Sequence, residues 1–319
     1  MNKHRKTALL VKSFKQLPLA LALTITGCAT QSINPVDKEP ALIIQAAHVF
    51  DGHALHSNSA VLIKANKIAA IDRIENLKQA NTRVLDLGDA TLMPGVIELH
   101  AHTAYRNIPV DTLLQQGITT VRDMGGPIFK TEGGNGQLRR LTVGSLLTAP
   151  GGYPIPRLGA DSAQTISDKA QAKTIVKQLI SQGAVAIKVA LEPGGEAGAP
   201  WTVAHGHGSH GHHAKQHYKP AGQWPLLSLS VVKTIVEQAH ALQRPVTAHV
   251  GEARGAKISL DAGVDEWAHM PCAALPDALL KQAVKQGVKI VGTLDTLSRC
   301  HGVEHNTRRW VALGGELLY

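Results

Sequence analysis

The sequence predicts an α/β fold: a (β/α)8 TIM barrel that is incomplete at its eighth unit, with a small N-terminal β-sandwich-like domain. Residues 40–93 contain Val- and Ile-rich runs that are punctuated by turn residues, as expected for strands. From residue 94 onward, short apolar runs alternate with helical patterns, which is typical of a parallel sheet. Segment 94–319 is shorter than the about 250 residues of a complete barrel, in agreement with a barrel cut inside its last unit.

The alternation predicts where each barrel element lies. Helices are expected where apolar residues recur at 3.6-residue spacing, and strands where short apolar runs lie between turn residues. The predicted helices cover 168–182, 231–242, 253–262, 276–286 and 306–313. The predicted strands cover 95–100, 117–123, a region near 141–147, 184–190, 245–250, 264–269, 288–292 and the start of an eighth at 316–319.

The start of the chain predicts export and membrane attachment. Residues 1–27 carry five basic residues and no acidic one, and the apolar run 17–25 is too short to span a bilayer. The run ends in Ile-Thr-Gly-Cys28, which resembles the lipobox of bacterial lipoproteins, where the Cys is acylated. Ala29, rather than Asp, follows it, which favours an outer-membrane lipoprotein that faces the periplasm. We therefore expect a lipoprotein signal over 1–28 and a tether over 29–39; the alternative is an ordinary signal peptide with a chance Cys.

Composition narrows the classes of protein that fit. A chain with 44% hydrophobic residues can form a large core and is not expected to be disordered. The formal charge of +9 is concentrated in residues 1–27, without which 28 basic residues remain against 24 acidic ones. A body this close to neutrality lacks the basic surface of a nucleic-acid-binding protein, so no nucleic-acid partner is expected.

Five basic side chains fall near the C-terminal ends of predicted barrel strands. His100 and His102 end the first barrel strand and share one face, because side chains alternate along a strand. Lys188 lies inside an apolar strand, where a charged amine is costly unless it is neutralised or paired. His249 and His269 end two further strands. Barrel active sites lie at this end and imidazoles bind zinc, so the pattern predicts a catalytic metal site.

The motifs around these residues resemble the amidohydrolase superfamily of metal-dependent hydrolases, in its imidazolonepropionase-like and Xaa-Pro-dipeptidase-like branch. The resemblance covers about residues 41–319, with the motifs in the family's order and spacing. It rests on the segments LMPGVIELHAH at 92–102, GITTVRDMGG at 117–126, TAPGG at 148–152, GAVAIKV at 183–189, and the run 246–269.

The resemblance implies a role for each candidate ligand. His100 and His102 would bind the more buried of two divalent ions, expected to be Zn²⁺, and His249 and His269 the other. Lys188, carboxylated by CO₂, would bridge them, and a metal-bridging hydroxide would attack an amide carbonyl. Asp123 would lie behind the ligands, or simply cap the turn that follows its strand. The implied activity is hydrolysis of C–N bonds in a small-molecule substrate, with dipeptides or N-acyl amino acids expected first.

Two features depart from the family pattern. Glu98 stands where relatives usually have Asp. The last strand of relatives ends in an Asp that binds metal and moves protons, whereas residues 313–319 read LGGELLY. Asp295 follows Gly-Thr-Leu but belongs to the seventh predicted strand, so no catalytic acid–base residue is assigned. Losing such a group costs about 10²–10⁴ in rate, and the chain is expected to be C-terminally truncated.

Two features lie outside these motifs. The segment 205–217 inserts six histidines between the fourth and fifth strands: His205, His207, His210, His212, His213 and His217. They either collect zinc or nickel over the mouth of the site or form a polar insertion with no role. Cys272 and Cys300 either pair in an oxidising compartment or remain two buried thiols.

Two other functions fit the sequence. A catalytically inactive truncated barrel would bind metal weakly and be poorly soluble, because its strand edges are exposed. A periplasmic metal-scavenging lipoprotein would use the His-rich segment, with the barrel as scaffold. Deleting 205–217 separates these functions, since a scavenger loses its metal capacity and an enzyme keeps its two ions.

Overall fold

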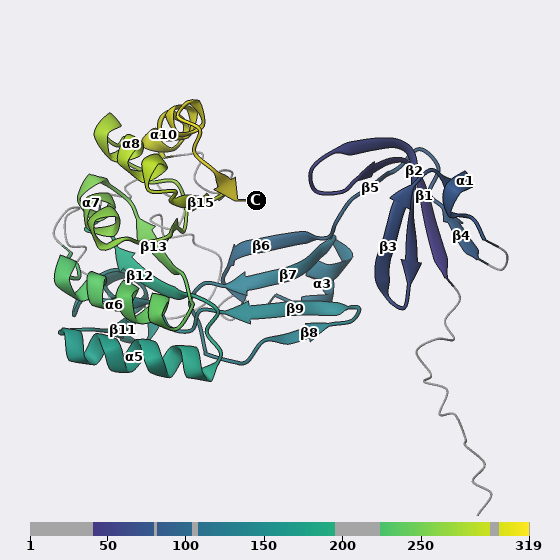
Figure 1. The fold of residues 1–319 in the computed structure, drawn as a ribbon. Coiled ribbons are helices and arrows are strands. Elements are labelled where there is room, and N and C mark those ends of the chain that lie inside the picture. Colours follow the sequence, from purple (N-terminus) through teal and green to yellow (C-terminus); the bar gives the residue numbers. More distant parts are fainter. Residues whose placement is uncertain (1–40, 80–81, 104–107, 195–223, 294–299, 319) are drawn as a thin grey trace, which may run out of the picture. The chain divides into compact units, whose positions relative to one another are not determined.

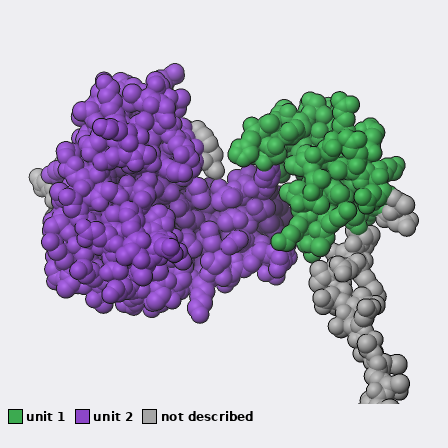
Figure 2. All heavy atoms as spheres, viewed as in Figure 1, with its two compact units in different colours: residues 1–93 green, residues 94–319 purple. Residues whose placement is uncertain are grey.

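The computed structural model describes residues 41–79, 82–103, 108–194, 224–293 and 300–318. The chain divides into two compact units, residues 1–93 and 94–319 (Figure 2). Cys28, the tether, the six histidines of 205–217 and Asp295 lie outside the described residues, so what was predicted for them stays a prediction. Within the described ranges, every helix is too short or too polar to cross a membrane.

The first unit is built around one five-stranded sheet. The central strand, β1 (Leu42–Phe50), pairs antiparallel with β2 (Leu55–Lys64), which pairs antiparallel with β3 (Lys67–Asp72). On its other edge β1 pairs parallel with β4 (Arg83–Asp86) and, further along, with β5 (Thr91–Leu92). The short helix α1 (Ile74–Leu77) follows β3.

This unit differs from the expected β-sandwich. Its apolar core is small and consists of Ile43, Ala60 and Leu62 from the sheet together with Leu77 from α1. A single helical turn therefore covers the apolar face that a second sheet would cover in a sandwich. In residues 41–93 as described, one sheet and one short helix replace the two packed sheets.

The second unit contains two mainly parallel sheets, and from β12 to β16 neighbouring strands follow one another in chain order (Figure 1). Its four-stranded sheet has the order β6-β7-β9-β8, and its seven-stranded sheet has the order β11-β10-β12-β13-β14-β15-β16. The strands are β6 (Val96–Ala101), β7 (Ile118–Asp123), β8 (Glu132–Gly134), β9 (Gln137–Thr142), β10 (Leu147–Thr148), β11 (Gln164–Thr165), β12 (Ile187–Leu191), β13 (Val246–Val250), β14 (Glu266–Trp267), β15 (Lys289–Val291) and β16 (Leu317–Leu318). All of these pairs are parallel except β8 with β9.

Helices connect these strands and pack on them in chain order. They are α3 (Val110–Gln115), α4 (Ile155–Leu158), α5 (Lys169–Gln182), α6 (Leu229–Ala241), α7 (Ala253–Ala262), α8 (Asp277–Lys285) and α10 (His301–Ala312), with a 3-10 turn at Ala160–Ser162. Figure 1 shows α5, α6 and α7 along one side of β12 and β13. The parallel α/β organisation predicted for 94–319 is therefore confirmed.

Helix α5 shows how the sequence specifies one of these helices. Asp168 accepts a hydrogen bond from the backbone N–H of Gln171 and so caps the helix start. Ile175, Val176 and Leu179 are buried at helical spacing against the core formed with β12 and α6. Gly183 ends the helix with φ of 122°, and a Cβ there would lie 2.6 Å from the carbonyl oxygen of Phe129.

Three predicted elements differ from the structure. The third strand is divided into β9 and β10 at Gly144, whose φ of +70° breaks the extended backbone. The strand predicted at 264–269 forms ladder bonds only at Glu266–Trp267. Helix α10 begins at His301 rather than 306.

No ladder bond joins β16 to β6 among the described residues, so the structure shows the strand order of a barrel without its closure.

A buried ion pair connects the two sheets of the second unit. The Arg122 guanidinium on β7 donates from Nη2 to Glu266 Oε1 at 2.6 Å and from Nη1 to Oε2 at 3.3 Å, on β14. Its Nε donates to the backbone oxygen of Leu99 on β6 at 2.9 Å. One side chain therefore ties three strands together, and both charges are almost fully removed from water.

Breaking this pair should destabilise the second unit strongly. Glu266→Gln removes the negative charge and leaves the Arg122 charge buried, so we expect a loss of about 3–5 kcal/mol in unfolding free energy. Denaturant unfolding measures it. Lys257→Ala, which removes an exposed ion pair with Asp261 on α7, is the control and should cost less than about 1 kcal/mol. A loss at Glu266 no larger than the control's would contradict the role assigned to this pair.

Candidate metal centre

Four of the five predicted metal ligands lie at or just after the C-terminal ends of strands, and the fifth, Lys188, is the second residue of β12. His100 belongs to β6 and His102 follows its last residue. Lys188 and His249 lie in β12 and β13, whose register pairs Lys188 with Thr247 and Ala190 with His249. His269 comes two residues after β14. The alternation of short strands and helices thus delivers all five side chains to one end of the second unit.

Ring and nitrogen contacts link all five side chains. Lys188 Nζ lies 3.1 Å from His100 Nε2, and His249 Nδ1 lies 2.9 Å from His269 Nε2. The His100 ring centroid is 5.3 Å from that of His102 and 5.9 Å from that of His269. His249 and His269 meet edge to face, with centroids 4.4 Å apart. The structure therefore brings these five predicted ligand positions together, whereas the six histidines of 205–217 lie outside the described residues.

The environment fixes the tautomer of His100. Its Nδ1 donates to the backbone carbonyl of Ala268 at 2.6 Å, because a carbonyl oxygen can only accept. A neutral ring then presents the lone pair of Nε2, the atom that faces Lys188. Histidine ligands of metals are commonly oriented in this way, by a hydrogen bond from the other ring nitrogen.

Burial keeps the first two imidazoles neutral. It is the main cause that lowers the pKa of His100 well below 6.5, and the neighbouring Lys188 charge adds to it. The pKa of His102 is lowered to about 4 for the same two reasons, against opposing contributions from Asp123 and the Gly125 backbone. Neutral imidazole is the form that binds metal, so the protein holds these rings ready to coordinate.

Two carboxylates lie close to the ligands and organise the local backbone. The fully buried Asp123 accepts from Thr103 Oγ1 at 2.5 Å and from the Gly125 N–H at 3.3 Å. Glu98 accepts from the His100 N–H at 2.7 Å. Asp123 therefore shapes the turn after β7, behind His102, and Glu98 braces the strand that carries both first-strand histidines.

Three residues of the site had no clear signal in the sequence. Tyr153 stacks on His249 with ring centroids 4.3 Å apart, and it also stacks on Trp224 with centroids 5.8 Å apart. Glu192 is fully buried just after β12, four residues beyond Lys188 and therefore on the same face of the strand. The position of Tyr153 was not predictable, because it follows the third strand, which is divided. Glu192 could have been predicted from its spacing of four residues from Lys188.

The donor set fits divalent ions when Lys188 is counted as a ligand. The described residues contain no group of three His, Cys, Asp or Glu side chains placed to hold an ion by themselves. The two imidazole nitrogens of His249 and His269, 2.9 Å apart, are nonetheless near the roughly 3.3 Å that separates two nitrogens on one tetrahedral Zn²⁺. A carboxylated Lys188 would add two oxygens to the four imidazoles.

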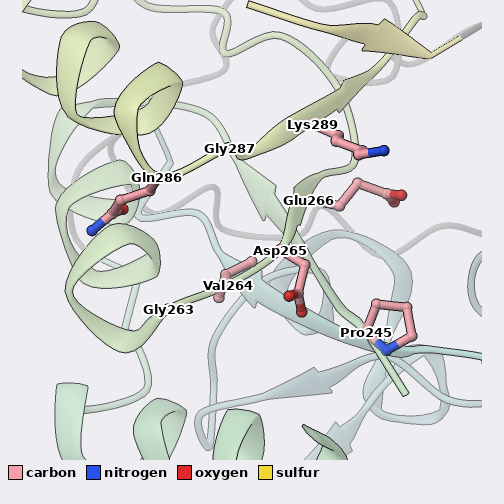
Figure 3. A pocket seen from close by; sticks show the side chains of 8 residues that line it. All are labelled: Pro245, Gly263, Val264, Asp265, Glu266, Gln286, Gly287 and Lys289. Atoms are coloured by element: carbon pink, nitrogen blue, oxygen red, sulfur yellow. The ribbon is translucent and has the colours of Figure 1, made fainter. Parts of the chain in front are cut away.

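A pocket of about 560 Å³ lies at the opposite end of the strands (Figure 3). Its lining comes from the residues that precede or begin β13, β14 and β15, among them Pro245, Asp265 and Lys289. None of the five candidate ligands lines it. Catalytic groups in β/α barrels gather at the C-terminal strand ends, so this pocket is not assigned to the metal centre.

Comparison with known proteins identifies the fold. No family model and no curated protein matches the chain. Among solved structures, the chain is similar to a prolidase complexed with N-methylphosphonate-L-proline, with a TM-score of 0.67, 18% identity, and coverage of 88% of this chain and 78% of that one. It is also similar to a Xaa-Pro dipeptidase with bound methionine (TM-score 0.66, 18% identity, 87% and 78% covered) and to A. niger ochratoxinase (0.62, 17%, 87% and 75%). At identities below 25%, the likeness shows a shared fold alone. It is the fold of the amidohydrolase structures among the matches.

Acid should destabilise the metal-free protein through its buried imidazoles. Because the pKa of His102 falls from 6.5 in the unfolded chain to about 4 in the folded one, the unfolded chain takes up a proton first as the pH drops. The contribution of the neutral His102 ring to the unfolding free energy is therefore fully present above pH 6.5. It declines from there towards pH 4, by up to about 1.4 kcal/mol per pH unit for one such group.

Urea unfolding in EDTA at a series of pH values across this window measures the effect. His102→Gln should flatten the pH dependence, whereas His53→Gln, at an exposed position of the first unit, should leave it unchanged. Equal slopes in the wild type and His102→Gln would show that burial does not hold this ring neutral.

Proposed function

We propose that this chain is a metal-dependent hydrolase of C–N bonds of the amidohydrolase superfamily. The observation that carries the proposal is the linked set His102–His100–Lys188 and His100–His269–His249, which gathers side chains from β6, β12, β13 and the segment after β14. The shared fold with prolidase and Xaa-Pro dipeptidase structures supports it, as does the order of the ligand motifs along the chain.

Lys188 is the residue on which a two-ion site depends. A buried ammonium beside an imidazole is costly, and carboxylation removes it. The neutral Nζ attacks the carbon of CO₂, an N–C bond forms, and one proton leaves to solvent. The resulting carbamate is an anion with two oxygens, suited to bridging two divalent cations, with zinc expected first among them.

The remaining residues bind and orient. His100 and His102 would hold one ion, and His249 and His269 the other. Bound ions would supply an activated water and polarise the scissile carbonyl. Asp123 fixes the backbone next to His102, and Tyr153 with Trp224 backs His249, so each side of the site has a rigid support.

Dipeptides and N-acyl amino acids are the substrates we propose first. The structures to which the chain is similar include a prolidase with a proline-containing phosphonate and a Xaa-Pro dipeptidase with methionine in its active site. The aromatic pair Tyr153 and Trp224 beside His249 offers an apolar wall of the kind that receives a small ring or aliphatic side chain.

Replacing Lys188 should abolish both the two-ion site and catalysis. Lys188→Ala cannot form a carbamate, so the variant should bind fewer ions and lose at least about 10²-fold in hydrolysis of a dipeptide panel. Metal analysis and an amine-release assay measure these effects. In ¹³C-bicarbonate, the wild type should show one carbamate carbon signal that Lys188→Ala lacks. Lys281→Ala, at an exposed position of α8, is the control. Unchanged turnover in Lys188→Ala would exclude the two-ion mechanism.

We also propose that the mature protein is anchored by lipid at Cys28 and faces the periplasm from the outer membrane. Cys28→Ser should move the protein from the membrane fraction to the soluble fraction and prevent incorporation of labelled palmitate, since a diacyl anchor binds membranes stably. Ser32→Ala, in the proposed tether, should leave both unchanged. A membrane-bound Cys28→Ser protein would indicate that another segment holds it there.

A further inference from the structure

We propose that Asn306 and the Cys272–Cys300 disulfide form a clamp that positions His269 for metal binding. The clamp acts on the 270–275 loop, which follows His269 directly and connects β14 to α8. This inference rests on the proposed function, because it concerns the ion that His249 and His269 would hold.

The side chain of Asn306 is committed to this loop. It lies on α10, is fully buried, and accepts from the Leu275 N–H at 2.9 Å. Its Nδ2 donates to the backbone oxygens of Pro271 at 3.0 Å and Ala273 at 2.8 Å, which uses both amide hydrogens. One amide therefore satisfies three backbone groups of a six-residue loop.

Two further contacts press the loop against the start of α10. The Gly302 N–H donates to the backbone oxygen of Cys272 at 2.7 Å, and a Cβ at this position would lie 2.3 Å from the carbonyl carbon of Ala273. Only glycine allows the two backbones to approach so closely. The disulfide between Cys272 and Cys300 then joins the loop covalently to the residue that precedes α10.

The clamped loop contacts His269 and the backbone two residues after His249, the two proposed ligands of the second ion. Met270, the first loop residue, is fully buried, and its carbonyl lies 3.4 Å from His269 Nδ1. The Ala273 N–H donates to the carbonyl of Gly251 at 3.0 Å, two residues after His249. Movement of the loop would therefore shift the backbone acceptor of one imidazole and the strand end that carries the other.

A clamp that positions His269 differs in a measurable way from one that only fastens α10. Both lose stability when broken, but only the first loses affinity for the second ion. Asn306→Asp keeps the shape and the acceptor while removing both donated hydrogen bonds. Cys272→Ser with Cys300→Ser breaks the covalent link without adding a chelating reductant. Val176→Ala, a core residue of α5, is a destabilised control whose helix packs on α6 and β12.

The experiment measures zinc stoichiometry and affinity by chelator competition, and cobalt absorption as a probe of ligand geometry. It uses the full chain with the six histidines of 205–217 replaced by Asn, at a temperature where denaturation curves show each variant folded. We expect two tight ions in the parent and in Val176→Ala. In Asn306→Asp and the double Ser variant we expect about 10–100-fold weaker binding of one ion and an altered cobalt spectrum.

The outcomes separate this inference from the proposal on which it rests. A parent protein that holds no tight ions overturns the proposed function and the clamp's role with it. Two tight ions in the parent and unchanged affinities in both clamp variants overturn the clamp alone. An equal loss of affinity in Val176→Ala would also overturn it, because general destabilisation would then account for the effect.

Discussion

The buried pair between Arg122 and Glu266 is the constraint around which the second unit is organised. Each charge would cost several kcal/mol to bury alone, so the pair is stable only when β7 and β14 meet across the interior. The ladders of the two sheets are separate, which makes this pair, together with the hydrogen bond from His100 to Ala268, a connection that sets one sheet against the other. The strands that the guanidinium joins, β6, β7 and β14, are those that deliver His100, His102, Asp123 and His269.

Local sequence patterns predicted the elements whose stability is local. Helix α7 was predicted at its observed bounds and α5 within one residue, because capping residues, apolar spacing and a terminal glycine all act over a few positions. The divided third strand was not resolved, since the break at Gly144 depends on the packing of Leu179 and Ile128 around it. The early start of α10 was missed for a similar reason: Gly302 weakens the helical pattern, and its contact with the 270–275 loop explains why glycine stands there.

The same distinction applies to the site. Histidines at strand ends are visible in a sequence, because a parallel fold places all such ends together. Contacts that depend on distant segments are not visible: Tyr153 reaches His249 from the loop after the third strand, and Asn306 reaches the loop after His269 from α10. The two cysteines illustrate the limit. Their spacing left a bridge and two free thiols equally open, whereas the fold places their Cα atoms 5.0 Å apart and joins them.

Under the proposed function, charge balance accounts for a lysine in so apolar a strand. Imidazole ligands add no charge to a metal site, so two divalent cations held by four of them would leave a large uncompensated positive charge. Asp123 is already engaged by Thr103 and Gly125, and Glu192 by the Gly194 N–H, so both carboxylates are held by their own turns. In the proposed two-ion site, a carbamate on Lys188 would replace a costly buried ammonium with the anion that two cations require. The proposed function thus treats the buried lysine as half of a ligand, which CO₂ would complete.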